Sequence, residues 1–346
     1  MRAQLLDRAV PYASPWRPLR LAEVPAPVAA PGEILVRVDV CAVCRTDLDL
    51  AEGRLVPPKF PIVPGHQVVG RVAALGAGVR DLAEGDRVGV AWIHWACGVC
   101  DWCRAGMENL CPRFQATGCD VHGGYAEYMT VPAAFAHVVP RELTDVAAAP
   151  LLCAGAIGWR SLRLTNLRDG EPLGLTGFGA SAHLVLQLAR RRFSRSPVYV
   201  FARAERERAF AMSLGASWAG DTTDAPPERL AAIIDTTPAW KPIVAALRVL
   251  RPGGRVVINA IRKETRDQSE LLSLDYGRDL WMEREIKSVA NVTRADVRET
   301  LDAATSGEIQ ATVEELPLDR ANEALELQAA PGGLRGSRVL RVRPAA

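Results

Sequence analysis

The chain has 346 residues and a formal net charge of +2, with 49% hydrophobic and 24% charged residues. This length suggests about two domains at ~150 residues each, and the composition is typical of a globular protein with a sizeable core. The small net charge argues against a nucleic-acid-binding protein. The longest nearly apolar stretch, residues 146–159, is too short to span a bilayer, and the N-terminal residues lack the apolar run of a secretory signal. We therefore expect neither a membrane protein nor an exported one.

The N-terminal part of the chain is predicted to be rich in β-strands. Apolar residues alternate with a period of two over 34–40, and short apolar runs bounded by glycines cover 68–74 and 87–91. Glycine-containing turns at 76–78 and 84–86 separate these segments.

The pattern changes at residue 173, where short apolar strands begin to alternate with helices. The predicted strands cover 173–176, 198–201, 233–235, 255–259 and 286–291, and the predicted helices cover 180–192, 205–214 and 243–250. This alternation indicates a parallel, doubly wound sheet. The last residues contain one helix, 318–328, and a strand-like tail, 337–342, which is too short to be a domain and is expected to return to the first one.

Four closely spaced cysteines form a candidate metal site. Cys97, Cys100, Cys103 and Cys111 are spaced C-x2-C-x2-C-x7-C, which is typical of a metal site rather than of a disulfide framework. Four thiolates can surround one Zn²⁺, and a complete set of protein ligands makes the metal structural rather than catalytic. An iron–sulfur cluster is the alternative, which Pro112 keeps open, although the seven-residue gap fits a ferredoxin pattern less well.

Three further residues are weak candidates when each is considered alone. Cys44 lies in a Cys-Arg-Thr-Asp segment, His66 follows Pro64-Gly65, and Cys153 follows two leucines. A buried cysteine is usually a small hydrophobic residue. Cys41 and Cys44 also form C-x-x-C, but no thioredoxin-like context surrounds this pair.

A glycine-rich turn follows the first strand of the predicted parallel sheet. The residues Gly177, Gly179, Ala180, Ser181 and Ala182 belong to a G-x-G-x-x-A motif between this strand and a helix, a context typical of dinucleotide binding. The first glycine permits a tight turn, and the second lets a pyrophosphate approach the helix N-terminus. A glycine turn without a ligand is the alternative.

The end of the next predicted strand bears on the choice of cofactor. An NAD site normally has Asp or Glu there, whereas this chain has Ala202-Arg203. Arg203 or Arg206 could bind a 2′-phosphate, so the sequence favours NADP, with NAD still open. Arg203 could instead be an ordinary surface residue of the following helix.

Taken together, these motifs resemble the zinc-containing alcohol dehydrogenases of the medium-chain dehydrogenase/reductase superfamily. The resemblance runs in order along essentially the whole chain, through residues 34–38, 44–47, 65–66, 75–78, 84–88, the cysteine cluster, 123–128, 150–155 and the nucleotide motif. It implies that Cys44, His66 and Cys153 bind a catalytic Zn²⁺, with a fourth position left for substrate oxygen or water.

The resemblance also suggests roles for the neighbours of these ligands. Asp47 corresponds to the family residue that orients the histidine ligand. Thr46 matches the hydroxyl that touches the substrate alcohol and passes its proton outward. Two positions depart from the family: Gln67 replaces a common Glu behind the metal, and Asp49 replaces a common His of the proton relay, so Asp49 either accepts the proton or is merely solvated.

Two arginines are further candidates by family position. Arg45 and Arg338 resemble the basic residues that hold the cofactor pyrophosphate, although Arg338 could equally be an exposed strand charge. Trp92 could line the substrate pocket or belong to the core.

The predicted fold is α/β, with a β-rich GroES-like catalytic domain and a doubly wound (Rossmann) cofactor domain. We place the catalytic domain at 1–154, with the structural zinc lobe at 93–113, the dinucleotide-binding domain at 155–291, and a return to the catalytic domain at 292–346.

The predicted activity is that of a zinc-dependent alcohol dehydrogenase or aldehyde reductase, with two Zn²⁺ per chain and NADP or NAD, acting on a primary or small secondary alcohol. The metal-like spacing of the cysteines leads us to expect a reducing, cytoplasmic location. The resemblance implies a homodimer or homotetramer. A polyol-type dehydrogenase is one alternative, although many of those have Glu at the third metal position. A zinc-stabilised nucleotide-binding protein with little turnover is another, and Gln67 is its best support.

Overall fold

The computed structural model describes residues 1–330 and 336–343, so parts of the predicted return segment, 331–335 and 344–346, lie outside the described residues. The chain divides into two compact units. The first unit comprises Met1–Ala156, Asn291–Gly307 and Ala311–Ala346, and the second comprises Ile157–Ala290 and Glu308–Gln310.

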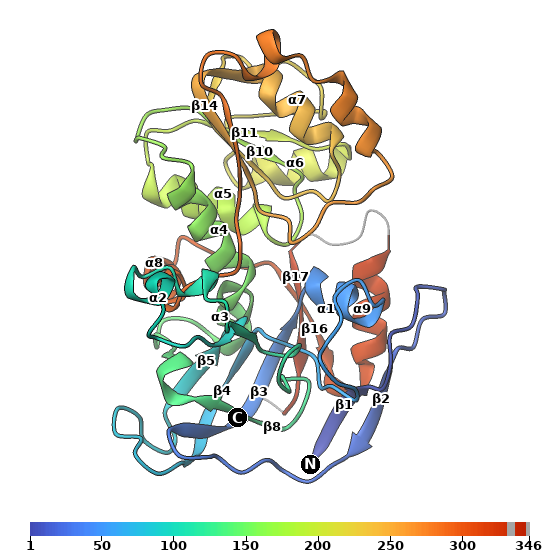
Figure 1. Cartoon of the computed structure of the whole chain (residues 1–346), viewed down its shortest axis with the longest axis vertical. Helices are drawn as coiled ribbons and strands as arrows, with labels where there is room; N and C mark the ends of the chain where they lie inside the picture. Colours follow the sequence, from blue (N-terminus) through green and yellow to red (C-terminus); the bar gives the residue numbers. More distant parts are fainter. Residues whose placement is uncertain (331–335, 344–346) are drawn as a thin grey trace. The chain divides into compact units, whose positions relative to one another are not determined.

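The first unit is built on a sheet of seven strands among the described residues, with β3 at its centre (Figure 1). The strands of this sheet are β16 (Val313–Pro317), β17 (Ser337–Arg341), β3 (Glu33–Val43), β4 (Val68–Leu75), β5 (Arg87–Val90), β9 (Ala136–Val138) and β8 (Tyr128–Pro132). β3 forms antiparallel pairs with β4, β8 and β17. Its residues Val36, Val38 and Val40 are fully buried, as the predicted period of two requires.

Smaller elements complete the first unit. Two antiparallel pairs are formed by β1 (Arg2–Leu6) with β2 (Leu19–Glu23) and by β6 (Ile93–Trp95) with β7 (Gln115–Ala116). The helices are α1 (Arg45–Ala51), α2 (Asp101–Arg104), α3 (Asp145–Ala148), α8 (Arg294–Ala304) and α9 (Ala321–Ala329), with α4 (Ala154–Leu164) crossing into the second unit. Short 3-10 turns are η1 (Glu108–Leu110), η2 (Ala133–Phe135), η3 (Ala149–Leu152) and η6 (Leu318–Arg320).

The second unit contains a parallel sheet of six strands in the order β12-β11-β10-β13-β14-β15. Its strands are β10 (Leu173–Thr176), β11 (Val198–Phe201), β12 (Trp218–Gly220), β13 (Leu230–Asp235), β14 (Leu250–Ile258) and β15 (Glu285–Ser288). The connecting elements are α5 (Ala182–Arg192), α6 (Glu205–Ser213), α7 (Lys241–Val249), η4 (Gln268–Ser273) and the π-turn η5 (Tyr276–Leu280). The strand order reverses between β10 and β13, which is where doubly wound sheets bind their ligands.

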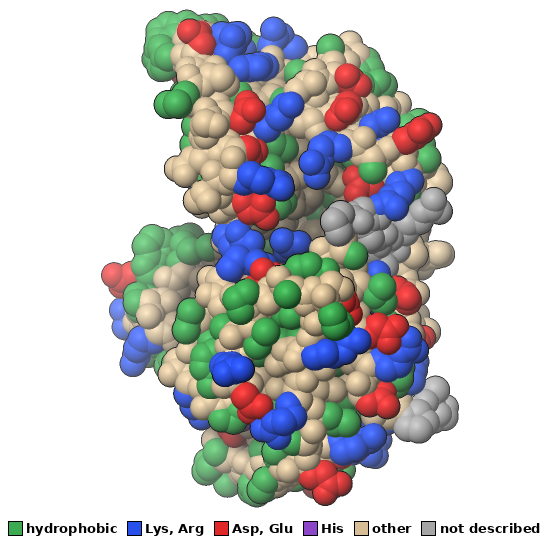
Figure 2. All heavy atoms as spheres, turned by 90° about the vertical axis from the view of Figure 1, so that its right-hand side faces the viewer, with side chains coloured by type: hydrophobic (Ala, Val, Ile, Leu, Met, Phe, Trp, Pro, Cys, Tyr) green, Lys and Arg blue, Asp and Glu red, His purple; other side chains and the backbone are tan. Residues whose placement is uncertain are grey.

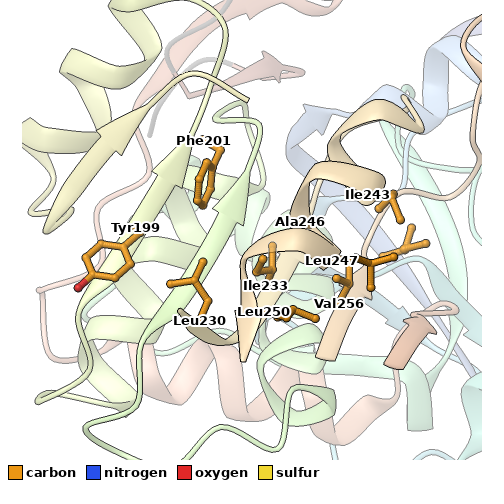
Figure 3. Close-up of a cluster of buried hydrophobic side chains, with 10 residues drawn as sticks. Tyr199, Phe201, Leu230, Ile233, Ile243, Ala246, Leu247, Leu250 and Val256 are labelled. Atoms are coloured by element: carbon orange, nitrogen blue, oxygen red, sulfur yellow. The ribbon is translucent and has the colours of Figure 1, made fainter. Parts of the chain in front are cut away.

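One side of this sheet is covered by α7, and the apolar side chains between them form a continuous core (Figure 3). Leu230, Ile233, Leu247 and Val256 are fully buried there. Burying each such side chain stabilises the fold by roughly 1.5–3 kcal/mol relative to an exposed one. This packing fixes the carboxyl end of β13, whose last residue, Asp235, supports the nucleotide turn described below.

The predicted fold class is confirmed, and the differences are local. α5 begins at Ala182 rather than at residue 180, because the glycine motif stays in the turn. The strand predicted at 255–259 begins earlier, at Leu250, as β14, where the pairing with β13 shifts register. β16 was not predicted, and it pairs in parallel with β17, which is the strand-like tail.

No helix among the described residues has the length and apolarity that a membrane crossing requires. On the face shown in Figure 2, basic and acidic side chains are interspersed, in keeping with the small net charge of +2.

Candidate metal centres and nucleotide-binding turn

The four clustered cysteines converge in the first unit. The Sγ atoms of Cys97, Cys100, Cys103 and Cys111 all lie within 4.8 Å of one another. Local elements produce this arrangement: Cys100 caps the N-terminus of α2, Cys103 lies within α2, and Cys111 follows η1.

The surroundings of these sulfurs fit a bound cation. Backbone N–H groups donate to sulfur at 3.4 Å, from Cys100 to Cys97 Sγ and from Cys97 and Arg113 to Cys111 Sγ. Hydrogen bonds from the Val99 backbone and the Arg113 side chain lower the pKa of Cys97 to about 5. Four sulfurs this close together can surround one ion, so this set fits a tetrahedral Zn²⁺.

Cys44, His66 and Cys153 form the second group of potential ligands, although they are far apart in the sequence. Their ligand atoms lie within 4.8 Å of one another, and the two sulfurs are 4.0 Å apart. Cys44 caps α1, while Cys153 follows η3 just before α4 begins. Among the described residues, this trio and the four-cysteine cluster are the two groups able to hold a metal ion.

The imidazole of His66 is fixed by the carboxylate of Asp47. His66 Nδ1 lies 3.4 Å from Asp47 Oδ1, and both side chains are almost fully buried. His66 Nε2 is also buried, and it has no hydrogen-bond partner among the described residues. A buried unpaired nitrogen is costly. An imidazole held at one nitrogen, with the other facing two sulfurs, fits a metal ligand.

Asp47 is held in turn by two further donors. Its Oδ2 accepts hydrogen bonds from the backbone N–H of Cys44 at 2.8 Å and from the hydroxyl of Tyr125 at 2.9 Å. Tyr125 is fully buried, and burial raises the pKa of its hydroxyl well above the ordinary value, so it remains a donor. Tyr125 is a site residue that the sequence analysis missed, although it lies in the 123–128 segment.

The pKa values of the three residues in the trio are shifted by their neighbours. Burial opposes protonation of His66, but the Asp47 carboxylate outweighs this effect and raises the histidine pKa to about 10. The hydrogen bond with Cys153 lowers the pKa of Cys44 well below its usual value, and the same contact raises that of Cys153. Metal binding requires both sulfurs as thiolates and the imidazole in its neutral form. A divalent cation bound to the trio would therefore displace the protons that these groups carry and balance the charge of the two thiolates.

The neighbouring predicted residues have different environments. Thr46 Oγ1 lies 3.6 Å from Cys44 Sγ, beside the trio. Asp49 is buried, and its carboxylate binds the guanidinium of Arg54 at 2.7 Å. Gln67 is buried and donates to the backbone carbonyl of Ala42 at 3.3 Å.

In the second unit, the glycine motif forms the turn between β10 and α5. Gly177 has a φ of +76°, and a Cβ at this position would lie 2.8 Å from the Thr237 side chain. A Cβ at Gly179 would meet open space. Gly177 is therefore required by its backbone and its neighbours, whereas Gly179 leaves room at the turn for a ligand.

A buried ion pair supports this turn from β13. Asp235, the last residue of β13, accepts hydrogen bonds from Thr176, Thr237 and the ammonium of Lys263. Lys263 also donates to the backbone carbonyls of Thr237 and Ala239, at 2.8 and 3.0 Å. The sequence analysis missed this network. The sequence signal that could have drawn attention to Lys263 was the rarity of lysine, since the chain has four lysines and 38 arginines.

The arginines that were predicted to bind the cofactor differ from one another in their exposure to solvent. Arg203 follows β11 and is exposed, as is Arg206. Arg45 is also exposed, at the start of α1. Arg338 is only 4% exposed and binds Glu314 at 3.1 Å, so its interpretation as an exposed strand charge is wrong. The roles of these arginines in cofactor binding stay predictions.

Known proteins resemble both the sequence and the structure. Residues 30–141 match the family described as the alcohol dehydrogenase GroES-like domain. The chain is 44% identical over 331 residues to the Mycobacterium tuberculosis protein named "Probable alcohol dehydrogenase AdhA", a match that covers 94% of this chain and 93% of that relative.

Two solved structures superpose on the chain. A cobalt- and zinc-bound thermostable alcohol dehydrogenase from Pyrobaculum aerophilum has a TM-score of 0.87 at 26% identity, with 99% of both chains covered. A Sinorhizobium meliloti 1021 protein bound to NADP has a TM-score of 0.85 at 25% identity, again with 99% of both chains covered.

Proposed function

Because the chain belongs to the alcohol dehydrogenases of the medium-chain dehydrogenase/reductase superfamily, we propose that it is a zinc-dependent alcohol dehydrogenase that uses NADP in preference to NAD. Its substrates are primary or small secondary alcohols and the corresponding carbonyl compounds. The observation that carries the proposal is the convergence of Cys44, His66 and Cys153, with a buried imidazole nitrogen that has no partner among the described residues.

Two sets of residues would hold metal. The four-cysteine cluster supplies a complete tetrahedral set and would hold a structural Zn²⁺, whereas the trio leaves one coordination position for substrate. When bound at the trio, Zn²⁺ supplies a positive charge that favours the deprotonated form of the substrate alcohol. Asp47 keeps the His66 ring in its orientation and selects Nε2 as the ligand atom.

Thr46 is the residue proposed to handle the substrate proton. Its hydroxyl lies beside Cys44, and a hydroxyl can accept one proton while it releases its own. An onward step through Asp49 stays a prediction. Because the Asp49 carboxylate is already bound to Arg54, it would have to accept a proton in competition with a cation.

The turn at Gly177–Ala182 is proposed to bind the pyrophosphate of the cofactor. The space at Gly179 and the start of α5 supply room and a favourable dipole. The nicotinamide, when bound, supplies the acceptor or donor of the hydride. The preference for NADP rests on Ala202-Arg203, where no carboxylate would repel a 2′-phosphate and an exposed guanidinium could bind it.

The experiment compares aldehyde-dependent oxidation of NADPH in the unmodified enzyme, in Cys44→Ala and in Cys119→Ala. Cys119 is a matched control because it is a buried cysteine outside both metal groups. We expect Cys44→Ala to lose at least ~100-fold in kcat/KM, since a ligand is removed outright, and Cys119→Ala to retain activity. Full activity of Cys44→Ala in a folded protein would contradict the proposal.

Two finer expectations accompany this proposal. The metal-binding cysteines need a reducing compartment, and none of the eight cysteines forms a disulfide, so we infer a cytoplasmic enzyme. A homodimer or homotetramer stays a prediction, which light scattering of the purified enzyme tests.

A further inference from the structure

A line of side-chain contacts within the first unit leads from the four-cysteine cluster to the trio. It begins at η1, the turn of Glu108–Leu110 that lies between Cys103 and Cys111. The backbone carbonyl of Asn109 in this turn accepts a hydrogen bond from Asn291 Nδ2 at 3.1 Å. The same asparagine accepts, at Oδ1, a hydrogen bond of 2.9 Å from the indole N–H of Trp92. The nitrogen and the oxygen of the Asn291 side-chain amide thus each form a hydrogen bond.

Trp92 continues the line to His66. The ring centroids of Trp92 and His66 are 4.8 Å apart, and the planes meet at 78°, an edge-to-face contact. His66 is thus held by Asp47 at Nδ1 and by Trp92 against its ring. A ring that is restrained twice cannot easily turn its Nε2 away from Cys44 and Cys153.

The turn at the other end of the line is itself firmly held. Glu108 in η1 accepts hydrogen bonds from the backbone N–H and the guanidinium of Arg294, at 2.7 to 3.1 Å. The backbone N–H of Cys111 donates to the Glu108 carbonyl at 3.1 Å. The turn is therefore tied both to Arg294 and to the loop that holds the last cysteine of the cluster.

The backbone of Asn291 is also unusual. Its φ of +51° lies in the left-handed region, which asparagine tolerates better than most residues other than glycine. Glycine at this position would keep the backbone but remove both side-chain hydrogen bonds. Asn166 has a φ of +56° and is exposed in the second unit, so it offers a matched control for the same substitution.

We propose that Asn291 is a positioning residue that couples the two metal sites: its amide ties the cysteine-cluster turn to Trp92, and Trp92 holds the His66 ring in its ligating orientation. This inference rests on the proposed function, because it assumes that both groups bind metal. Its consequence is that damage to the four-cysteine cluster loosens the catalytic metal, through Asn291, without any change in the trio itself.

The test measures the kinetics of zinc transfer from the full-length enzyme to a chromophoric chelator. The kinetic phase in which zinc leaves the trio, here called the trio phase, is identified because Cys153→Ala lacks it. We expect both Asn291→Gly and Cys103→Ser to accelerate this phase about tenfold, the scale of a lost ligand-orienting contact. The double variant is expected to be no faster than the faster single variant, because both changes break the same line of contacts. Asn166→Gly is expected to leave the phase unchanged.

Other outcomes distinguish a failure of the coupling through Asn291 from a failure of the proposed function. An unchanged trio phase in Asn291→Gly, or effects that multiply in the double variant, would overturn the coupling alone. If Cys103→Ser fails to fold, Trp92→Phe takes its place, since it keeps a ring against His66 but lacks the indole N–H. Its effect should likewise not multiply with that of Asn291→Gly, and multiplication would again overturn the coupling. A wild-type enzyme without the trio phase would instead refute the proposed function.

Discussion

Replacing Tyr125 with Phe removes a single hydroxyl whose effect on the metal site can be estimated from the structure. This hydroxyl donates to Asp47 Oδ2 at 2.9 Å, in a fully buried position. Asp47 would keep the backbone N–H of Cys44 as a donor to that oxygen, but its buried carboxylate would lose one of two donors there. Leaving a buried charged acceptor less satisfied costs about 1–3 kcal/mol.

This cost should appear mainly in zinc affinity, because the other oxygen of Asp47 holds His66. Since 1.4 kcal/mol corresponds to tenfold, the penalty is equivalent to roughly 5- to 150-fold in affinity. We expect Tyr125→Phe to release zinc from the trio faster and to lose kcat/KM at limiting zinc. Excess zinc should restore most of the activity, because no ligand has been removed.

Tyr199→Phe is the matched control. Tyr199 is also buried, and its hydroxyl donates to the carboxylate of Glu228 at 2.7 Å, but this pair lies in the second unit. Both variants therefore lose a tyrosine–carboxylate hydrogen bond. If Tyr125→Phe retains zinc as well as Tyr199→Phe does, the idea that Asp47 orients His66 under the control of Tyr125 is wrong.

Three further predictions concern the second unit. Lys263→Met is expected to destabilise the protein by about 3–5 kcal/mol in chemical denaturation, because it leaves the Asp235 carboxylate buried without its cation; adding Asp235→Asn should recover part of this loss, and no recovery would contradict the explanation. Burial lowers the pKa of His183 to about 4, so its unfolded form, with an ordinary pKa near 6.5, takes up the proton first as the pH falls. His183 should then contribute about 1.4 kcal/mol per pH unit to the decrease in the free energy of unfolding below pH ~6.5, to a total of about 3 kcal/mol at pH ~4, and an equal pH slope in His183→Gln would show that His183 makes no such contribution. Arg203→Ala is expected to raise the KM for NADPH about tenfold and to leave that for NADH nearly unchanged, whereas equal effects on both cofactors would exclude contact with a 2′-phosphate.

Local sequence patterns predicted those parts of the protein that depend on local structure. The period of two in β3, the spacing of the four cysteines and the glycine turn at Gly177 each lie within one short segment. The strand–helix alternation in turn predicted the doubly wound sheet, which the structure confirms. Cys44, His66 and Cys153 were brought together by resemblance to a family, since nothing in their spacing indicates that they meet.

The supporting contacts could not be predicted because their partners are distant in sequence. Tyr125 and Asp47 are 78 residues apart, and Trp92 and Asn291 are 199 apart. No periodicity or spacing rule relates such pairs, and each residue has an ordinary local explanation. The burial of Arg338 is a similar case, because it depends on the pairing of β17 with β16 and β3.

The central claim is that three side chains from separate segments hold a second metal ion besides the one in the cysteine cluster. Elemental analysis of the purified enzyme tests it most directly, together with Cys153→Ala. The account predicts two zinc ions per chain in the unmodified enzyme and one in the variant, with the remaining ion bound by the four cysteines. One zinc per chain in both proteins would contradict the claim.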